Sequence, residues 1–400
     1  MERQTFDLPG SPHRLTVLRF GAPGGQERSD RVIEPGGQER SDRVIEPSGQ
    51  ERSDRGIESR TGQKAYLQAG LHADEFPGML VLRILAGHLA EAEARGAVHG
   101  EILLVPQANP IGLAQTETSF VSGRLENGTW ENFNRNYADL SDLGSLSLGA
   151  DAASNVETIR AAMSARLGAM QPDGALAHLR HRLLTLAHDA DLVLDLHADN
   201  EAEPHMYVGP ALWPAAEDIA AAIDARAVLL SEASGGATPF DEACAAPWWT
   251  LAANHPAVPI PPACLGATLE LGSNDDVNPE RAADQALALL RMLEGRGFVD
   301  GSGGRPRLSC HATALTAMAQ VKSPVTGLVA YRRRLGDWVH KGDLVATVID
   351  PLGGETELLA ETDGRLFARH SQPYAWPGRV IGKIAGEIPL ESRTGNLLSD

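Results

Sequence analysis

The sequence predicts an α/β fold with a mixed, largely parallel central sheet flanked by helices, followed by a small C-terminal all-β domain. Between residues 64 and 297, apolar strands alternate with amphipathic helices, which is typical of a sheet covered by helices. Helical periodicity stops at the glycine-rich stretch 301–307, and short strands separated by glycine turns follow from about 318 to 386. A chain of 400 residues also exceeds the usual size of one compact domain.

Each expected element follows from its own local pattern. Short apolar runs predict strands at 14–20, 64–70, 101–107, 191–197 and 266–272. Apolar residues at helical spacing predict helices at 79–94, within 153–188, at 215–230 and at 279–297. A long loop rich in Gly, Asn and Thr is expected from 108 to about 150. These elements predict a first domain over 1–300, a linker over 301–317 and a β domain over 318–390.

A tandem repeat interrupts this pattern near the N-terminus. Residues 24–35 read GGQERSDRVIEP, and residues 36–47 repeat that string unchanged before a third, altered copy. The unit is shorter than a solenoid repeat and offers little apolar surface to bury. We therefore expect residues 22–60 to form a solvated, disordered insert. The flanking strands 14–20 and 64–70 are expected to be neighbours joined by this expanded hairpin loop, since added loop length costs little.

Charge and cysteine content exclude several classes of protein. The formal net charge is -18, from 35 basic and 53 acidic residues, which argues against a nucleic-acid or anionic-membrane binder. Three scattered cysteines without a C-x-x-C pair argue against a disulfide framework or a cysteine-ligated zinc site. The first residues lack the apolar core of a secretory signal, and no segment approaches the roughly 20 apolar residues of a membrane span. A cytoplasmic location is the expectation.

Three side chains form a candidate metal site. His72 and Glu75 lie three residues apart between a predicted strand and a predicted helix, so both can face one point once the chain turns helically. His197 ends another predicted strand. Because sites in open α/β sheets form outside the carboxyl ends of strands, the three can meet at one sheet edge. Two imidazoles and a carboxylate with an open fourth position form the ligand set of a catalytic zinc ion, which polarises carbonyls and acidifies water.

Alternatives remain open at this site. H-x-x-E taken alone is more often an accidental or surface pair, so the inference depends on the strand-end placement and on the second histidine. His205 follows His197 at a short distance and is a further candidate for the pocket wall.

Five segments then occur in a recognisable order. They are GLHADE (70–75), PQANPIGL (106–113), NFNRNY (132–137), DLVLDLH (191–197) and TLELG (268–272). In this order they resemble the succinylglutamate desuccinylase/aspartoacylase family, which shares its catalytic fold with the zinc carboxypeptidases. The resemblance covers roughly 64–300. It implies one Zn²⁺ per chain held by His72, Glu75 and His197, with Glu270 as the general base.

The resemblance also implies roles for residues around the metal. Arg135 would grip a substrate carboxylate, with Asn134 beside it. Arg124 would stabilise the oxyanion that develops on the scissile carbonyl. Asp195 is a candidate hydrogen-bond partner of a ligand histidine, although a strand-partner role is equally open. Ala73 departs from the glycine common in the family.

The C-terminal segment resembles a biotinyl/lipoyl-like β fold. SPVTGLVAYRRRLGDWVHKGDLVATVID resembles one half of such a fold, and ETDGRLFARH resembles the second half. The connecting stretch DPLGGETELLA contains no lysine, which argues against covalent carriage of a cofactor. Family members often carry a β domain beside the active site, so we expect a module that shapes the pocket or forms an oligomer.

The predicted function is zinc-dependent hydrolysis of the amide bond of a small N-acyl amino acid or related N-acyl compound. The implied partner is that small-molecule substrate, and a homo-oligomer stays open. Two alternatives are a metallocarboxypeptidase acting on peptides and a catalytically inactive metal- or ligand-binding relative. Retention of Glu270 beside all three expected ligands argues against the inactive relative.

Overall fold

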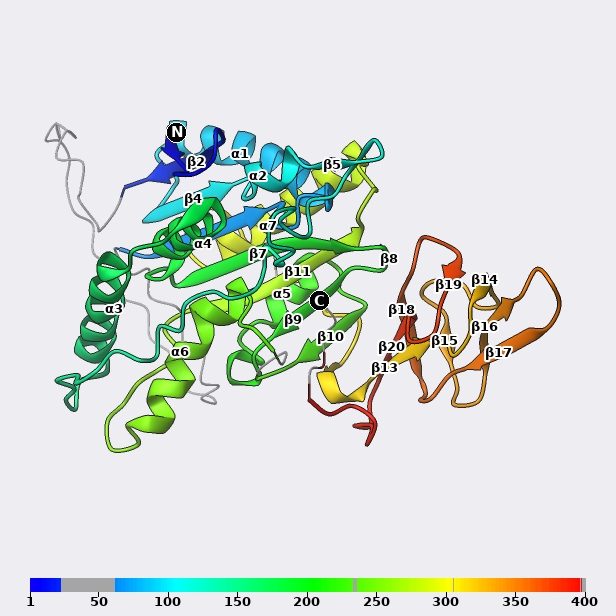
Figure 1. Cartoon of the computed structure of the whole chain (residues 1–400). Helices are drawn as coiled ribbons and strands as arrows, with labels where there is room; N and C mark the ends of the chain where they lie inside the picture. The colour runs from blue at the N-terminus through cyan, green and yellow to red at the C-terminus, as the bar shows by residue number, and fades with distance from the viewer. Residues whose placement is uncertain (23–61, 233–235, 305, 396, 398–400) are drawn as a thin grey trace, which may run out of the picture.

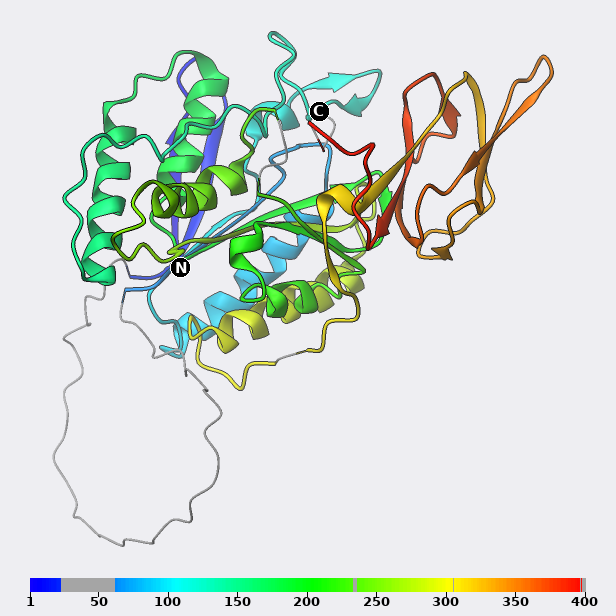
Figure 2. The same ribbon diagram turned by 90° about the horizontal axis from the view of Figure 1, so that it is seen from below.

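A computed structural model describes residues 1–22, 62–232, 236–304, 306–395 and 397. A nine-stranded mixed sheet separates two layers of helices, and two smaller sheets from the C-terminal part of the chain lie at one edge of this body (Figures 1 and 2). The expected mixed α/β fold is therefore confirmed. The expected disordered insert at 22–60 lies, apart from its first residue, outside the described residues.

The main sheet has the strand order β1-β2-β4-β3-β7-β11-β9-β10-β12. Its strands are β1 (Glu2–Asp7), β2 (Arg14–Gly21), β3 (Lys64–Ala69), β4 (Glu101–Val105), β7 (Leu192–Asp199), β9 (His205–Val208), β10 (Ala227–Leu230), β11 (Leu265–Ser273) and β12 (Ala312–Ala314). The central strands β4, β3, β7 and β11 pair in parallel. Strands β1 and β2 pair antiparallel, as do β2 and β4, and β11 and β9.

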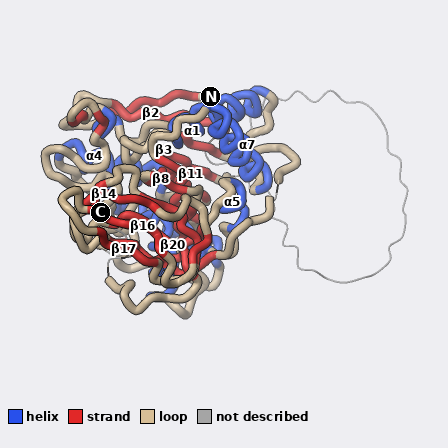
Figure 3. The backbone as a smooth tube through the Cα atoms, turned by 90° about the vertical axis from the view of Figure 1, so that its right-hand side faces the viewer, coloured by secondary structure: helices blue, strands red, loops and turns tan. Residues whose placement is uncertain are grey.

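Successive side chains along the strands point to opposite faces of the sheet and pack into two separate hydrophobic cores. One core joins the sheet to α1 (Pro77–Ala94), α5 (Glu217–Ala222) and α7 (Pro279–Gly295). The other joins it to α3 (Ala152–Ala169), α4 (Gly174–Ala187) and α6 (Phe240–Asn254). Figure 3 shows α1, α5 and α7 together along one side of the sheet. Strand β3 shows why both faces are covered: Ala65 and Leu67 are buried in the first core, and Tyr66 is buried in the second.

The candidate ligands lie at one edge of this sheet, as expected. His72 and Glu75 follow β3 directly, and His197 lies near the end of the neighbouring strand β7. Glu270 lies near the end of β11 and pairs in register with His197. Because β3, β7 and β11 are parallel neighbours, their carboxyl ends bring these side chains together.

Two expectations about the sheet are wrong. Strands β2 and β3 are not neighbours, because β4 inserts between them, pairing antiparallel with β2 and parallel with β3. A helix was expected over 215–230, but the observed helix α5 ends at Ala222. The last apolar residues of the expected helix, 227–230, form strand β10 instead. Asp224 adopts a left-handed backbone conformation with φ of 52°, which stops the helix. Pairing with β9 and β12 then draws residues 227–230 into the sheet.

The expected loop at 108–150 is largely irregular but contains short elements. They are α2 (Pro110–Leu113), β5 (Thr116–Glu117) and β6 (Phe120–Val121). The side chain of Asn109 caps α2 by accepting a hydrogen bond from the backbone of Gly112. This loop passes over the edge of the sheet where the candidate site lies.

The C-terminal part of the chain forms two small sheets with a core of their own. Their strands are β13 (Met318–Lys322), β14 (Gly327–Tyr331), β15 (Trp338–Val339), β16 (Leu344–Ile349), β17 (Glu355–Leu359), β18 (Gly364–Arg369), β19 (Tyr374–Ala375) and β20 (Val380–Gly386). Strand β8 (Glu201–Ala202), which follows β7, pairs antiparallel with β18 and so joins these sheets to the main body. In the expected linker, residues 312–314 form the edge strand β12. No helix in the described part of the chain is long and apolar enough to cross a bilayer.

Candidate active site

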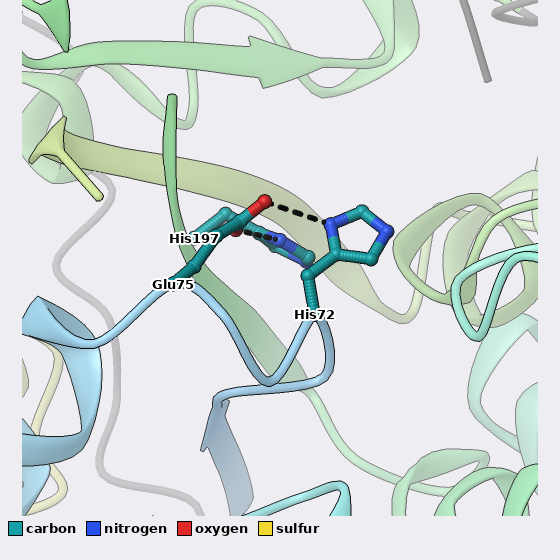
Figure 4. A group of neighbouring side chains, drawn as sticks. All are labelled: His72, Glu75 and His197. Carbon is teal, nitrogen blue, oxygen red and sulfur yellow. Dashed lines mark hydrogen bonds and ion pairs between the residues drawn. The ribbon is translucent and has the colours of Figure 1, made fainter. Parts of the chain in front are cut away.

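His72, Glu75 and His197 converge on one point (Figure 4). One potential ligand atom from each lies within 4.8 Å of the other two, and all three residues are buried. Glu75 stands between the rings: its Oε1 is 2.9 Å from Nδ1 of His72, and its Oε2 is 2.7 Å from Nδ1 of His197. The backbone N–H of Ala198 also donates to Oε2 at 3.0 Å. The predicted trio is therefore assembled in space.

The far side of each imidazole contacts an oxygen that orients the ring. Nε2 of His72 is 2.9 Å from Oδ1 of Asn132, and Nε2 of His197 is 3.0 Å from Oδ2 of Asp195. Of the two roles left open for Asp195, the structure therefore supports a contact with a ligand histidine. Asn132 was not among the expected site residues, although it opens the NFNRNY segment that drew attention to its neighbours.

The contacts behind Asp195 continue into the core. Gln68 donates from Nε2 to Oδ1 of Asp195 at 3.0 Å, and the Tyr66 hydroxyl donates to Oε1 of Gln68 at 2.8 Å. Tyr66, Gln68 and Asp195 are fully buried. A buried chain of hydrogen bonds of this kind holds Asp195, and through it the His197 ring, more firmly than a single contact does.

Electrostatics favour a carboxylate form of Glu75. Burial alone raises the pKa of this carboxyl, but the imidazoles of His72 and His197 beside it hold the pKa well below its usual range. Burial and the Arg124 guanidinium lower the pKa of His72 to about 4. An anionic carboxylate and a neutral imidazole are the forms that bind a divalent metal. Burial lowers the pKa of His197, but the Asp195 and Glu75 carboxylates hold it well above its usual range, so a metal that binds here would displace a proton from this ring.

Arg124 reaches the same centre from the loop that follows β6. Its Nη1 is 3.2 Å from both Nδ1 of His72 and Oε1 of Glu75, while its side chain remains partly exposed. The preceding residue explains the close approach. Ala73 donates its backbone N–H to the carbonyl of Gly123 at 3.0 Å, and a Cβ on Gly123 would lie 2.4 Å from the Cβ of Ala73. Only glycine at 123 therefore lets the two loops touch.

Asn134 and Arg135 are buried beside the trio. Oδ1 of Asn134 accepts the backbone N–H of Phe240 at 2.8 Å, which ties the start of α6 to the site. The backbone N–H of Asn134 donates a hydrogen bond to Oδ1 of Asn132 at 2.8 Å. Nη1 of Arg135 donates to the Asn134 carbonyl at 2.8 Å, and the residue lines the cavity described below.

Glu270 faces the same cavity from β11. Its Oε2 is buried and has no hydrogen-bond partner among the residues that the structure describes. Burial and the nearby Glu75 carboxylate raise the pKa of Glu270 to about 8. A carboxyl with a raised pKa in a cavity is typical of a group that exchanges protons.

These residues share one cavity of about 980 Å³, counting its open mouth. All seven expected site residues line it: His72, Glu75, Arg124, Asn134, Arg135, His197 and Glu270. The C-terminal part of the chain supplies further wall residues that the sequence did not indicate, namely Leu315, Gln320 and Lys383. Lys383, on β20, forms an ion pair with Asp199, which lies two residues after His197. The volume and lining are those of a small-molecule site.

His205 does not line the cavity. It pairs in register with Glu270 across the sheet, but its ring is buried between Tyr207 and Phe367, with ring centroids 5.5 and 4.8 Å away. Its contacts make it a packing residue between the main sheet and strand β18. The structure therefore does not support the open alternative that His205 lines the pocket.

The ligand set fits a divalent metal of the zinc type. Two imidazole nitrogens and a carboxylate face each other, both rings are oriented from behind by oxygens, and the trio opens on a cavity. A structural zinc site would instead present four protein ligands and no open face.

Solved structures of similar fold come from proteins described in related terms. A succinylglutamate desuccinylase/aspartoacylase family protein from Shewanella amazonensis is 23% identical, with a TM-score of 0.77 over 96% of this chain and 98% of that chain. A protein of the same description from Shewanella frigidimarina is 20% identical, with a TM-score of 0.76 over 98% of each chain. The product-bound ectoine utilization protein EutE (DoeB) from Ruegeria pomeroyi is 21% identical, with a TM-score of 0.57 over 82% of this chain and 86% of that chain. At these identities the likeness establishes the fold.

The sequence itself carries the family assignment. No curated protein matches the chain significantly. The profile of the succinylglutamate desuccinylase/aspartoacylase catalytic domain, however, matches residues 61–296, which is more than half of the chain and includes every expected site residue. The chain therefore belongs to the succinylglutamate desuccinylase/aspartoacylase family of deacylases.

Proposed function

We propose that this protein hydrolyses the amide bond of a small N-acyl amino acid or related N-acyl compound, with one Zn²⁺ bound by His72, Glu75 and His197. One observation supports this most strongly: the three ligand atoms lie within 4.8 Å of one another in a cavity that Glu270 and Arg135 also line. When bound, the ion would polarise the scissile carbonyl and acidify the attacking water.

Glu270 is the proposed general base. Its free Oε2 can take a proton from the attacking water and then pass that proton to the leaving nitrogen, so that carboxylate and amine are released. The fixed position of Glu270 on β11, in register with His197, holds this carboxyl at the site without a mobile loop.

The arginines and Asn134 are the proposed substrate contacts. Arg135 is buried at the cavity wall and suits a substrate carboxylate, since guanidinium binds carboxylate in a planar, two-pronged manner. Asn134 lies beside it. Arg124 reaches the trio and is the proposed donor to the carbonyl oxygen, where negative charge develops.

The C-terminal sheets support a small substrate over a peptide. Leu315, Gln320 and Lys383 add a wall to the cavity, and the strand pair β8–β18 fixes that wall to the end of β7. We propose that residues 318–390 form a pocket-shaping domain of biotinyl/lipoyl-like type. The β16–β17 turn, closed by a hydrogen bond from Asp350 to the carbonyl of Gly354, carries no lysine and therefore no cofactor attachment point.

Metal analysis combined with turnover tests this function. The purified protein is expected to hold about one zinc per chain and to release amine from acetylated or succinylated amino acids until a chelator removes the ion. Glu270→Gln is expected to keep the zinc while turnover falls by a factor on the order of 100 or more. Turnover of peptides alone would favour a carboxypeptidase, and zinc uptake without any turnover would favour an inactive relative.

A further inference from the structure

Asn132 orients the His72 ring from the long loop between β6 and α3. Its Oδ1 is 2.9 Å from Nε2 of His72 and also accepts the backbone N–H of Asn134 at 2.8 Å. Because a carboxamide oxygen only accepts hydrogen bonds, this contact places the His72 proton on Nε2 and leaves the lone pair of Nδ1 facing Glu75. The orientation of the His72 ring therefore depends on where the loop holds Asn132.

Arg180 on helix α4 holds the part of the loop that carries Asn132. Its Nη2 donates to the backbone carbonyl of Asn132 at 2.8 Å, and its Nη1 donates to Oε2 of Glu131 at 2.9 Å. Hydrogen bonds from Arg180 and Asn136 lower the pKa of Glu131, which favours the charged partner. A guanidinium can make both contacts at once because its donors form a rigid, planar fork.

Burial of this guanidinium has a cost that its loop contacts offset. The Arg180 side chain is only 11% exposed, and Leu176, Leu179 and Leu183 on the same helix are buried in the core that α4 shares with α3 and α6. A charged side chain at this depth gives up hydration and is rarely found without a partner. Within the described part of the chain, the hydrogen bonds of Arg180 go to two adjacent loop residues. Arg180 is therefore stabilised only while the loop lies where it is observed.

We propose that Arg180 is a positioning residue of the metal centre, which holds the backbone of Asn132 and thereby the ring of His72. The inference rests on the proposed function, in which His72 is a zinc ligand. Arg180 is not among the residues that line the cavity, and the proposed catalytic steps give it no role. It acts through Asn132 and not by contact with a substrate.

Arg160 provides a matched control at the other end of the sheet. It is a partly buried arginine on α3 whose Nη2 donates to a carboxylate, Oδ1 of Asp191, and to the backbone carbonyl of Ala263, both at 2.9 Å. Asp191 and Ala263 lie just before β7 and β11, at the ends of these strands opposite the metal ligands. Arg160→Met is therefore expected to lower stability, as Arg180→Met does, without changing the metal centre.

Zinc affinity, measured by competition with a chromophoric chelator, tests the positioning role. Arg180→Met is expected to weaken zinc binding by about tenfold, the lower end of the loss that follows when a ligand histidine loses an outer partner. Arg180→Lys keeps the charge but cannot make both contacts, so its affinity is expected to lie between those of Arg180→Met and wild type. Arg160→Met is expected to bind zinc as wild type does. If Arg180→Met does not fold, Arg180→Lys carries the same comparison.

A double-mutant cycle with Asn132→Ala tests whether Arg180 acts through Asn132. Asn132→Ala keeps the backbone carbonyl that Arg180 binds but removes the carboxamide that orients His72. In this background Arg180→Met is expected to weaken zinc binding further by less than about twofold. The positioning role is wrong if Arg180→Met weakens binding equally in both backgrounds, or if Arg160→Met weakens binding as much as Arg180→Met does.

Zinc binding does not depend on turnover, so the positioning role and the proposed function can fail separately. If no N-acyl compound is hydrolysed but the coupling between Arg180 and Asn132 is measured, the proposed hydrolysis fails and the positioning role stands. If acetylated or succinylated amino acids are hydrolysed and Arg180→Met binds zinc as wild type does, the positioning role is wrong and the proposed hydrolysis stands.

Discussion

Oδ2 of Asp195 lies 3.0 Å from Nε2 of His197, on the side of the ring opposite Glu75. Burial lowers the pKa of His197, but the carboxylates of Asp195 and Glu75 outweigh it and hold the pKa well above its usual range. The contact of Nε2 with Asp195 leaves Nδ1 of His197 facing Glu75 and the ligand trio. This contact is the reason a strand interior that is otherwise apolar carries a fully buried aspartate.

Replacing Asp195 with Asn should therefore weaken metal binding. The neutral amide keeps the shape of the side chain but loses the charge, so zinc affinity is expected to fall by about 10- to 100-fold. Competition against a chromophoric chelator measures this affinity. Tyr66→Phe removes only the outermost hydroxyl of this hydrogen-bond chain, which donates to Gln68, and is expected to lower zinc affinity by much less than Asp195→Asn does. An Asp195→Asn protein with wild-type affinity would assign this carboxylate a purely structural role.

Gly123→Ala should damage the site through the loops that carry it. The added Cβ would lie 2.4 Å from the Cβ of Ala73 and 2.9 Å from its Cα, so the Arg124 loop and the His72 loop must separate. Displacements of about 1 Å at a catalytic group can cost on the order of 100-fold in rate, and a fall in kcat/KM of that order is expected. Adding Ala73→Gly, which removes the opposing Cβ, is expected to restore part of the lost rate. Equal activity of the single and double variants would show that this contact does not position Arg124.

Lys383→Met should destabilise the protein by leaving a buried charge without its partner. The Lys383–Asp199 pair joins β20 to the end of β7, and both side chains are largely buried. Removing one partner of such a pair is expected to lower the free energy of unfolding by about 3 kcal/mol. Urea denaturation measures this loss. The double variant Lys383→Met/Asp199→Asn should lose less than the single variant, and a larger loss would argue against the buried-charge explanation.

His205 should make the fold sensitive to acid. Burial lowers the pKa of this imidazole to about 4, its side chain is fully buried, and its Nδ1–H donates to the carbonyl of Glu203 at 2.9 Å. The unfolded chain takes up the proton near the ordinary pKa of about 6.5, but the folded chain does so only near 4. The stabilisation is therefore complete above pH 6.5 and declines as the pH falls toward 4, by about 3 kcal/mol in all.

The pH dependence of unfolding in wild type and in His205→Phe isolates this contribution from that of other histidines. The variant is expected to show a shallower loss of stability between pH 6.5 and 4, whatever its stability at neutral pH. Parallel curves for the two proteins would mean that His205 titrates normally in the fold.

Local sequence patterns were sufficient for the parts of the chain that depend on local physics. The apolar runs at β3, β4, β7 and β11 are buried on both faces of the sheet, so the local sequence of each run is sufficient to predict a strand. His72, Glu75 and His197 follow or end such strands, and a parallel sheet gathers strand ends at one edge. The ligand trio was therefore predictable from the sequence.

Tertiary structure alone decided what depends on contacts between distant segments. Residues 227–230 continue the apolar pattern of the preceding helix, and pairing with β9 and β12 makes them a strand. Strand β4 lies between β2 and β3 because an apolar strand can pair on both of its edges. The local sequence does not predict which strands become its partners. Lys383 enters the active-site wall from nearly 200 residues beyond His197, and the burial of Asp241 depends on how α6 packs on β11. The spacing of apolar residues along the chain indicates helices and strands locally. Strand order and burial depend instead on the packing free energy of the whole fold, to which residues distant in the sequence contribute.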